Sequence, residues 1–185
     1  MKKTLLILAS IISPLVFSAQ LQWGSLGVGA KVDVSPAGGV LTNYTAYLCV
    51  VTGEDTSVAT CVDQLKAGTW VAQSIGAGES IPSKTLAAGG QVPATYTELD
   101  TTFVAGTSYD FYVVIIDEAQ EWALVSSVLN RSPITGSMMS DGALFTSEEF
   151  SAGSGGWVLI GPEPTVLALL ALGVAGVALR RKVSA

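Results

Sequence analysis

The sequence predicts an all-β fold, a single antiparallel β-sandwich-like domain, and three observations support this prediction. Short runs of β-branched and aromatic residues recur along the middle of the chain. Clusters of Gly, Pro, Ser and Asp separate these runs at short intervals, as between the strands of a sandwich. No convincing amphipathic helical pattern stands between them.

The expected strands differ in how strongly their residue pattern favours a strand. Pro93 lacks a backbone N–H and therefore confines its segment to a sheet edge. Gly156 opens the last segment, just before the C-terminal tail. The expected strands are residues 44–51, 69–75, 91–97, 108–116, 121–128, 143–146 and 156–160.

The strongest strand pattern covers residues 108–116. Phe111, Val113 and Ile115 share one face, and apolar residues also occupy the other face. Apolar residues on both faces predict a central strand that is covered on both sides. A turn at 117–120 then leads into the next expected strand, so we expect the pair to form a hairpin.

We divide the 185 residues into four parts. We expect residues 1–18 to form a signal peptide and residues 19–150 to form a β-rich extracytoplasmic domain. Residues 151–161 are a Gly/Ser-rich linker with a possible last strand. Residues 162–185 form a C-terminal tail with an expected transmembrane helix over 165–179.

The N-terminus has the parts of an export signal. A short basic start with Lys2 and Lys3 is followed by an apolar stretch over residues 5–17. Val16 and Ser18, at the −3 and −1 positions, predict cleavage after Ser18, with cleavage after Ala19 as the alternative. The stretch is too short to span a bilayer comfortably, which favours removal over an uncleaved anchor.

Export sets the redox environment of Cys49 and Cys61, the only cysteines of the chain. An even cysteine number in an oxidising compartment predicts one disulfide between them. The alternative is two unrelated free thiols. Cys61 is expected in a strand over residues 57–62 that follows the strand of Cys49, so that the bridge would link the two strands of a hairpin or, alternatively, close a loop.

The middle of the chain is acidic. Between Gln20 and Pro162 there are 4 basic and 14 acidic residues, a net charge of about −10. Such a surface repels nucleic-acid phosphates, so we expect no nucleic-acid partner. Histidine, the commonest general base and metal ligand, does not occur in the sequence. We therefore expect no enzyme, no metal site and no cofactor.

The C-terminus combines three kinds of segment. Pro162, Glu163 and Pro164 are kept extended by the two prolines. Residues 165–179 carry no charge and would span about 22 Å as a helix, a marginal fit to a bilayer. A basic cluster follows, which the positive-inside rule places in the cytoplasm, leaving the preceding domain outside. The cluster consists of Arg180, Arg181 and Lys182.

This ending resembles the PEP-CTERM sorting signal over about the last 24 residues. The resemblance implies that Pro162, Glu163 and Pro164 are the recognition site of an exosortase, a membrane-embedded protease or transpeptidase. It implies partnership with that enzyme, besides signal peptidase and the general secretion machinery. It also implies export through an inner-membrane-anchored intermediate to the periplasm, the outer surface or the extracellular matrix. A tail anchor that is never cut is the alternative.

The sequence contains few patterns that indicate catalysis or ligand binding. No nucleophile-elbow, phosphate-loop or metalloprotease motif occurs. Carboxylates cluster at residues 117–121 and 148–149, a pattern that fits solvated turns better than a glycosidase pair or a calcium site. We expect a structural or interaction protein of the cell envelope. The alternatives are an exopolysaccharide-binding module, for which the aromatic residues would supply a stacking platform, and a secreted hydrolase.

Overall fold

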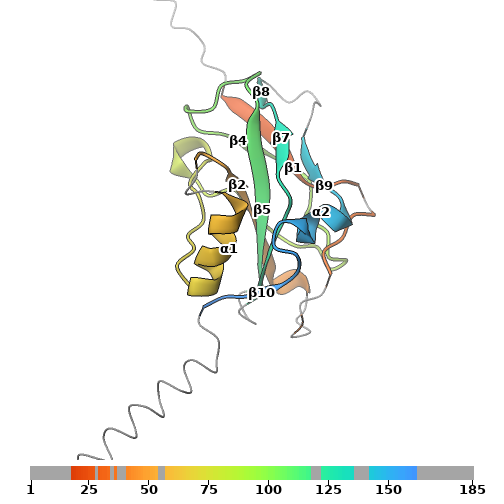
Figure 1. Ribbon diagram of the computed structural model, residues 1–185. Coiled ribbons are helices and arrows are strands. Elements are labelled where there is room, and N and C mark those ends of the chain that lie inside the picture. The colour runs from red at the N-terminus through yellow and green to blue at the C-terminus, as the bar shows by residue number, and fades with distance from the viewer. Residues whose placement is uncertain are drawn as a thin grey trace, which may run out of the picture.

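The computed structural model describes residues 18–27, 29–33, 36, 41–53, 57–117, 122–135 and 142–161 (Figure 1). These residues form ten strands, two α-helices and two short 3-10 helices. In chain order the elements are β1 (Ala19–Ser25), η1 (Leu41–Asn43), β2 (Tyr44–Val50), α1 (Val58–Ala67), η3 (Ala77–Glu79), β3 (Ser83–Thr85), β4 (Thr95–Glu98), β5 (Tyr109–Asp117), β6 (Trp122–Val125), β7 (Leu129–Arg131), β8 (Ile134–Thr135), β9 (Ala143–Phe145), α2 (Ser147–Ala152) and β10 (Val158–Leu159).

The strands make two sheets. The larger has the order β10-β6-β5-β2-β3, with β7 pairing a further stretch of β5, and all its pairs are antiparallel. The smaller has the order β4-β1-β8, with β9 beside β1. The β1–β9 pair is parallel. The prediction of a mostly β, largely antiparallel fold is therefore confirmed.

The two sheets share one hydrophobic core. Leu21 and Trp23 of β1 pack in the same cluster as Leu48 of β2 and Phe111 of β5. Because successive side chains of a strand point to opposite faces, each sheet contributes every second residue to this core. This face-to-face packing gives the sandwich-like arrangement.

A second core lies on the opposite face of the larger sheet, beneath α1. Cys61 and Leu65 of α1, one helical turn apart, are buried against Tyr112, Val114 and Val125. β5 therefore contributes to both cores, one from each face. The predictions of a doubly covered central strand and of a hairpin with β6 are both confirmed.

Helix α1 is absent from our sequence-based expectation, which placed Cys61 in a strand. β-branched Val58, Thr60 and Val62 favour a strand by propensity. The local signals favour a helix instead. The Ser57 side chain caps the first turn by accepting from the Thr60 backbone N–H at 3.2 Å. Gly68 ends the helix in the left-handed conformation.

The expected strand at residues 69–75 is also wrong. Residues 69–75 have no strand pairing, and Val71 is 77% exposed. The Gln73 side chain instead bonds to the Val50 backbone, accepting from its N–H at 2.7 Å and donating to its carbonyl at 3.1 Å. A side-chain amide thus takes the place of a neighbouring strand at the end of β2.

The segment expected as a linker, residues 151–161, is packed against the domain. It holds the end of α2, a turn and the edge strand β10, which pairs with β6. Ser154 accepts from the Val125 backbone N–H at 3.0 Å and donates to the Gly156 carbonyl at 2.6 Å. Its composition is linker-like, but its backbone is fixed by these bonds.

Several predicted features lie outside the described residues. They are the signal peptide except Ser18, the turn at 118–120, Asp141, the motif Pro162-Glu163-Pro164, the helix over 165–179 and the basic cluster Arg180, Arg181 and Lys182. Among the described residues, no helix combines the length and the apolar character that crossing a membrane requires.

Candidate functional site

The candidate site is the junction at which the C-terminal tail leaves the domain. After β10, the backbone N–H of Gly161 donates to the carbonyl oxygen of Leu65 at 2.9 Å. Leu65 lies in the last turn of α1, so the chain is bonded to that helix end immediately before Pro162. Figure 1 shows β10 and the end of α1 at one end of the domain and the start of β1 at the other.

Two glycines allow this close approach. Gly68 closes α1 with φ 69°, and its N–H bonds to the carbonyl oxygens of Gln64 and Leu65. A Cβ on Gly68 would lie 3.2 Å from the Cα of Gly161. Gly161 itself has φ 89°. Both positions have a backbone conformation that residues with a Cβ rarely adopt.

The turn before β10 is equally tight. A Cβ on Gly153 would overlap with the carbonyl oxygen of Ser126. Trp157 then packs edge-on against the buried ring of Tyr44, with ring centroids 5.5 Å apart. Together with Ser154, these contacts fix the path of the chain from α2 to the junction.

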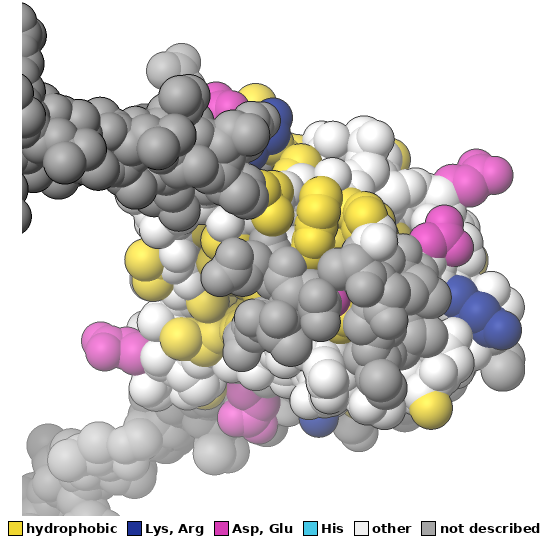
Figure 2. Space-filling view, turned by 90° about the horizontal axis from the view of Figure 1, so that it is seen from below, with side chains coloured by type: hydrophobic (Ala, Val, Ile, Leu, Met, Phe, Trp, Pro, Cys, Tyr) yellow, Lys and Arg dark blue, Asp and Glu magenta, His cyan; other side chains and the backbone are white. Residues whose placement is uncertain are grey.

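The face around the junction is shown in Figure 2. Apolar side chains gather over the upper middle and left of this face, and most of the visible charged side chains lie toward its rim. Lys66, in the last turn of α1, is exposed next to the junction. Its positive charge complements the negative end of the helix dipole.

Cys49 and Cys61 are both free thiols in the structure, so the predicted disulfide is corrected. Cys61 lies on α1 and not on a strand, and it packs against the sheet that contains Cys49. The Tyr112 hydroxyl interacts with both thiols. Burial raises the pKa of Cys61 to about 11, and burial, with Cys61 nearby, raises the pKa of Cys49 further. Both thiols are therefore protonated at neutral pH and are poor nucleophiles.

The structure describes the predicted carboxylate clusters only in part. Asp117 is buried at the end of β5, whereas Glu118 and Glu121 lie outside the described residues. Glu149 accepts from the Thr146 backbone N–H at 2.8 Å and so completes the capping box of α2. Glu148 is exposed. Within the described part of the chain, no three Cys, Asp or Glu residues group as metal ligands.

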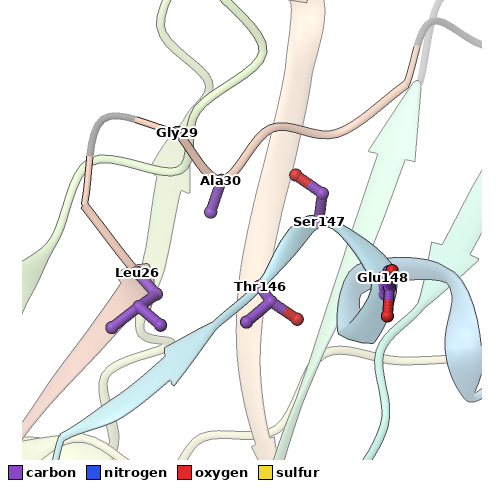
Figure 3. A pocket seen from close by; sticks show the side chains of 6 residues that line it. All are labelled: Leu26, Gly29, Ala30, Thr146, Ser147 and Glu148. Atoms are coloured by element: carbon purple, nitrogen blue, oxygen red, sulfur yellow. The ribbon is translucent and has the colours of Figure 1, made fainter.

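Glu148 lines a shallow depression of about 450 Å³ together with Leu26 (Figure 3). The side chain of Ser147, the first residue of α2, points toward the loop that holds Gly29 and Ala30, whereas the side chain of Thr146 points away from that loop. The Ser147 hydroxyl closes part of this space by accepting from the Lys31 backbone N–H at 2.8 Å. The depression offers one exposed carboxylate.

The aromatic residues serve mainly as core. Trp23, Tyr44 and Tyr112 are fully buried, and Trp70 packs edge-on against Tyr47 at 5.5 Å. Tyr96 of β4, at 42% exposure, is the exposed large aromatic of the described residues. A row of exposed aromatic rings is therefore not formed by the described side chains.

Comparison with known proteins is informative for the tail. No curated protein and no solved structure matches the chain. The family model of the PEP-CTERM protein-sorting motif matches residues 162–182, which begin directly after Gly161. This motif implies an exported protein that passes through a membrane and is processed by an exosortase. The C-terminal tail is therefore a PEP-CTERM sorting signal, as the sequence predicts.

Proposed function

We propose that the protein is a non-enzymatic structural or interaction protein of the cell envelope. Its β-domain is displayed beyond the membrane, and an exosortase processes its tail. The observation that carries the proposal is the matched sorting motif at residues 162–182, placed immediately after a folded domain.

The sequence supports the topology of this proposal. The basic cluster Arg180, Arg181 and Lys182 follows the apolar stretch and holds the C-terminus in the cytoplasm by the positive-inside rule. The domain at the other end then faces outward. Processing breaks one peptide bond near Pro162-Glu163-Pro164. The carbonyl carbon on the N-terminal side of that bond is transferred to water or to an accepting amine. The tail leaves with a new amino terminus.

The non-enzymatic part of the proposal is supported by what the acidic and thiol groups do. Glu149 is engaged in capping α2, and Cys49 and Cys61 are buried and protonated. Activated nucleophiles and general bases instead need exposure and a pKa near the working pH. These groups have structural roles in the described domain.

Mass spectrometry of the protein isolated from cells tests the proposal. With the exosortase present, we expect a chain that begins near Ala19 and ends near Pro162. Without the enzyme, or after Pro162, Glu163 and Pro164 are all changed to Ala, we expect the chain to extend to Ala185. Glu148→Ala, which removes an exposed carboxylate from the domain, is the control and is processed normally. A chain that ends at Ala185 in every strain contradicts the proposal.

A second candidate function, binding of an exopolysaccharide, is favoured by the outer face of the smaller sheet. Gln22 of β1 lies opposite Tyr96 of β4, and Gln20 lies opposite Glu98. Gln20 Nε2 donates to Glu98 Oε1 at 3.2 Å. An exposed ring beside amides and a carboxylate on an open sheet suits a sugar ring and its hydroxyls.

Electrophoresis of the protein through gels that contain a neutral polysaccharide tests this candidate. Binding retards the protein, and Tyr96→Ala should abolish the retardation. The control is Val104→Ala, which removes an apolar side chain that is 60% exposed elsewhere on the surface. Equal mobility with and without polysaccharide contradicts the candidate.

A further inference from the structure

The residues just before the sorting motif are bonded into the fold. Val158 and Leu159 form the edge strand β10, which pairs with Ala123 and Trp122 of β6. Gly161 then donates its N–H to the carbonyl of Leu65. We call these two sets of bonds, from β10 to β6 and from Gly161 to Leu65, the C-terminal latch.

The latch conflicts with what a protease needs. A protease holds its substrate as an extended chain on both sides of the bond that it cuts, and it bonds to the substrate backbone. Gly161 has φ 89°, which is not extended, and its N–H is already used. β10 on its upstream side is paired with β6. A cut near Pro162 therefore requires residues that the folded domain holds.

We propose that the C-terminal latch must open before the tail is processed, so that opening of β10 and Gly161 sets the rate of processing. The inference rests on the proposed function, because it concerns the same cut. The partner is the processing enzyme, which binds residues 158–161 only after they leave the domain. The folded domain thereby controls access to its own sorting motif.

The geometry allows the latch to open without unfolding the rest. β10 is a two-residue edge strand, and β6 stays paired with β5 through its other edge. The Leu65 carbonyl keeps the bond from the Gly68 N–H, so α1 remains capped. Gly155 and Gly156, both with positive φ, lie at the base of the segment that moves. Such small edge units open at much lower free energy than the whole domain.

Opening exposes one buried side chain, Val158, and also separates Trp157, which follows Gly156, from the ring of Tyr44. Val158 is 9% exposed and packs in the second core with Leu65. Ile160 is half-buried against the same core. The latch is therefore closed for most of the time, because these apolar contacts are lost when β10 leaves.

The decisive experiment inserts a twelve-residue Gly/Ser spacer between Gly161 and Pro162 in the full-length chain. Processing is followed by pulse-chase in cells that contain the exosortase. The spacer supplies free extended residues upstream of the motif while the latch stays closed. We expect processing to accelerate about tenfold, because cleavage of an opening segment follows the population of its open state.

A second variant weakens the latch and keeps the wild-type spacing. Gly68→Ala places a Cβ 3.2 Å from the Gly161 Cα, and we expect faster processing than in the wild type. Gly27→Ala is the matched control, since Gly27 has φ 70° but no atom of the described residues lies within 4 Å of the added Cβ. Both carry similar backbone strain, and only Gly68→Ala touches the latch.

The outcomes separate the two proposals. If wild type and spacer variant are cut at the same rate, or the spacer variant more slowly, the latch does not control processing and the inference is overturned. If neither chain is cut in cells that process another substrate of the same enzyme, the proposed function fails and the inference fails with it.

Discussion

Gly153 lies directly against the carbonyl group of Ser126, at the point where α2 turns back toward β10. A Cβ at position 153 would overlap with the Ser126 oxygen and would lie 2.7 Å from its carbonyl carbon. The backbone of Gly153 has an ordinary helical conformation, with φ −69° and ψ −42°. The requirement for glycine here comes from space and not from backbone conformation.

Gly153→Ala should therefore destabilise the protein by about 1–3 kcal/mol, the usual cost of overpacking. Urea unfolding followed by tryptophan fluorescence measures this loss. Gly29→Ala is the control, because no atom of the described residues lies within 4 Å of its added Cβ and its backbone is outside the left-handed region. Equal midpoints for the two variants would contradict the packing at Ser126.

The Ser126 side chain is hydrogen-bonded to the backbone of the central strand β5. Its buried hydroxyl accepts from the Val113 backbone N–H at 2.8 Å and donates to the Ser127 carbonyl at 2.8 Å. Ser126→Ala leaves the Val113 N–H buried without this acceptor, at a cost of about 1–3 kcal/mol. The unfolding midpoint in urea should fall accordingly.

The neighbouring serine provides the matched control for that experiment. The Ser127 hydroxyl oxygen is buried and has no hydrogen-bond partner in the described part of the chain. Ser127→Ala removes a desolvated polar atom and should be neutral or slightly stabilising. If Ser127→Ala costs as much as Ser126→Ala, the hydrogen bonds of Ser126 do not explain its contribution.

The buried thiols predict a loss of stability at alkaline pH. The pKa of Cys61 is about 11 in the folded protein, above its ordinary value of 9.0, because burial disfavours the thiolate. From about pH 9 upward the unfolded chain releases this proton and the folded chain keeps it. Stability should therefore be full below pH 9 and should fall as the pH rises toward 11.

Urea midpoints measured from pH 7 to 11 test this slope, and Cys61→Ala should flatten it. Burial also raises the pKa of Cys49 and of Tyr112, so part of the slope persists in that variant.

Iodoacetamide should modify Cys49 and Cys61 slowly in the native protein, and rapidly in urea without reductant. A chain two hydrogens lighter and unreactive in urea would show a disulfide instead.

The capping box of α2 predicts unequal roles for two adjacent carboxylates. Glu149 bonds to the Thr146 backbone N–H at 2.8 Å, while exposed Glu148 faces solvent at the shallow depression. Glu149→Ala should cost about 1 kcal/mol through loss of the cap. Glu148→Ala should cost less than half as much, and urea unfolding compares them. A larger loss for Glu148→Ala would contradict the assignment.

The central features of the fold are predictable from local pattern. Apolar residues on both faces of 108–116 identify β5 correctly, and the C-terminal motif is recognised from the order of its three parts. Helix α1 is missed because β-branched residues outweigh its caps at Ser57 and Gly68. The spacing of Cys61 and Leu65, both buried on one face, is the signal that finds it.

The junction could not be predicted from the sequence. Residues 151–156 have the composition of a flexible linker, and tertiary contacts order them, among them the bond that the Val125 backbone N–H donates to the Ser154 hydroxyl. The bond between Gly161 and Leu65 joins residues far apart in the chain. The hydrophobic periodicity of a sequence gives no information about a single backbone contact of this kind. The glycines at 68 and 161 indicate only that the backbone has unusual freedom there.

The opposite placement of the two ends has a mechanical consequence. Tension applied between Ala19 and Gly161 runs along the length of the domain, which β5 spans over nine residues, or about 30 Å. β1 is held on both edges by β4, β8 and β9, whereas β10 is held by two residue pairs. Under load we therefore expect the C-terminal end to separate first, while the rest of the domain stays folded. Local unfolding at β10 would thus lengthen the connection to the membrane and protect the rest of the domain from the applied force.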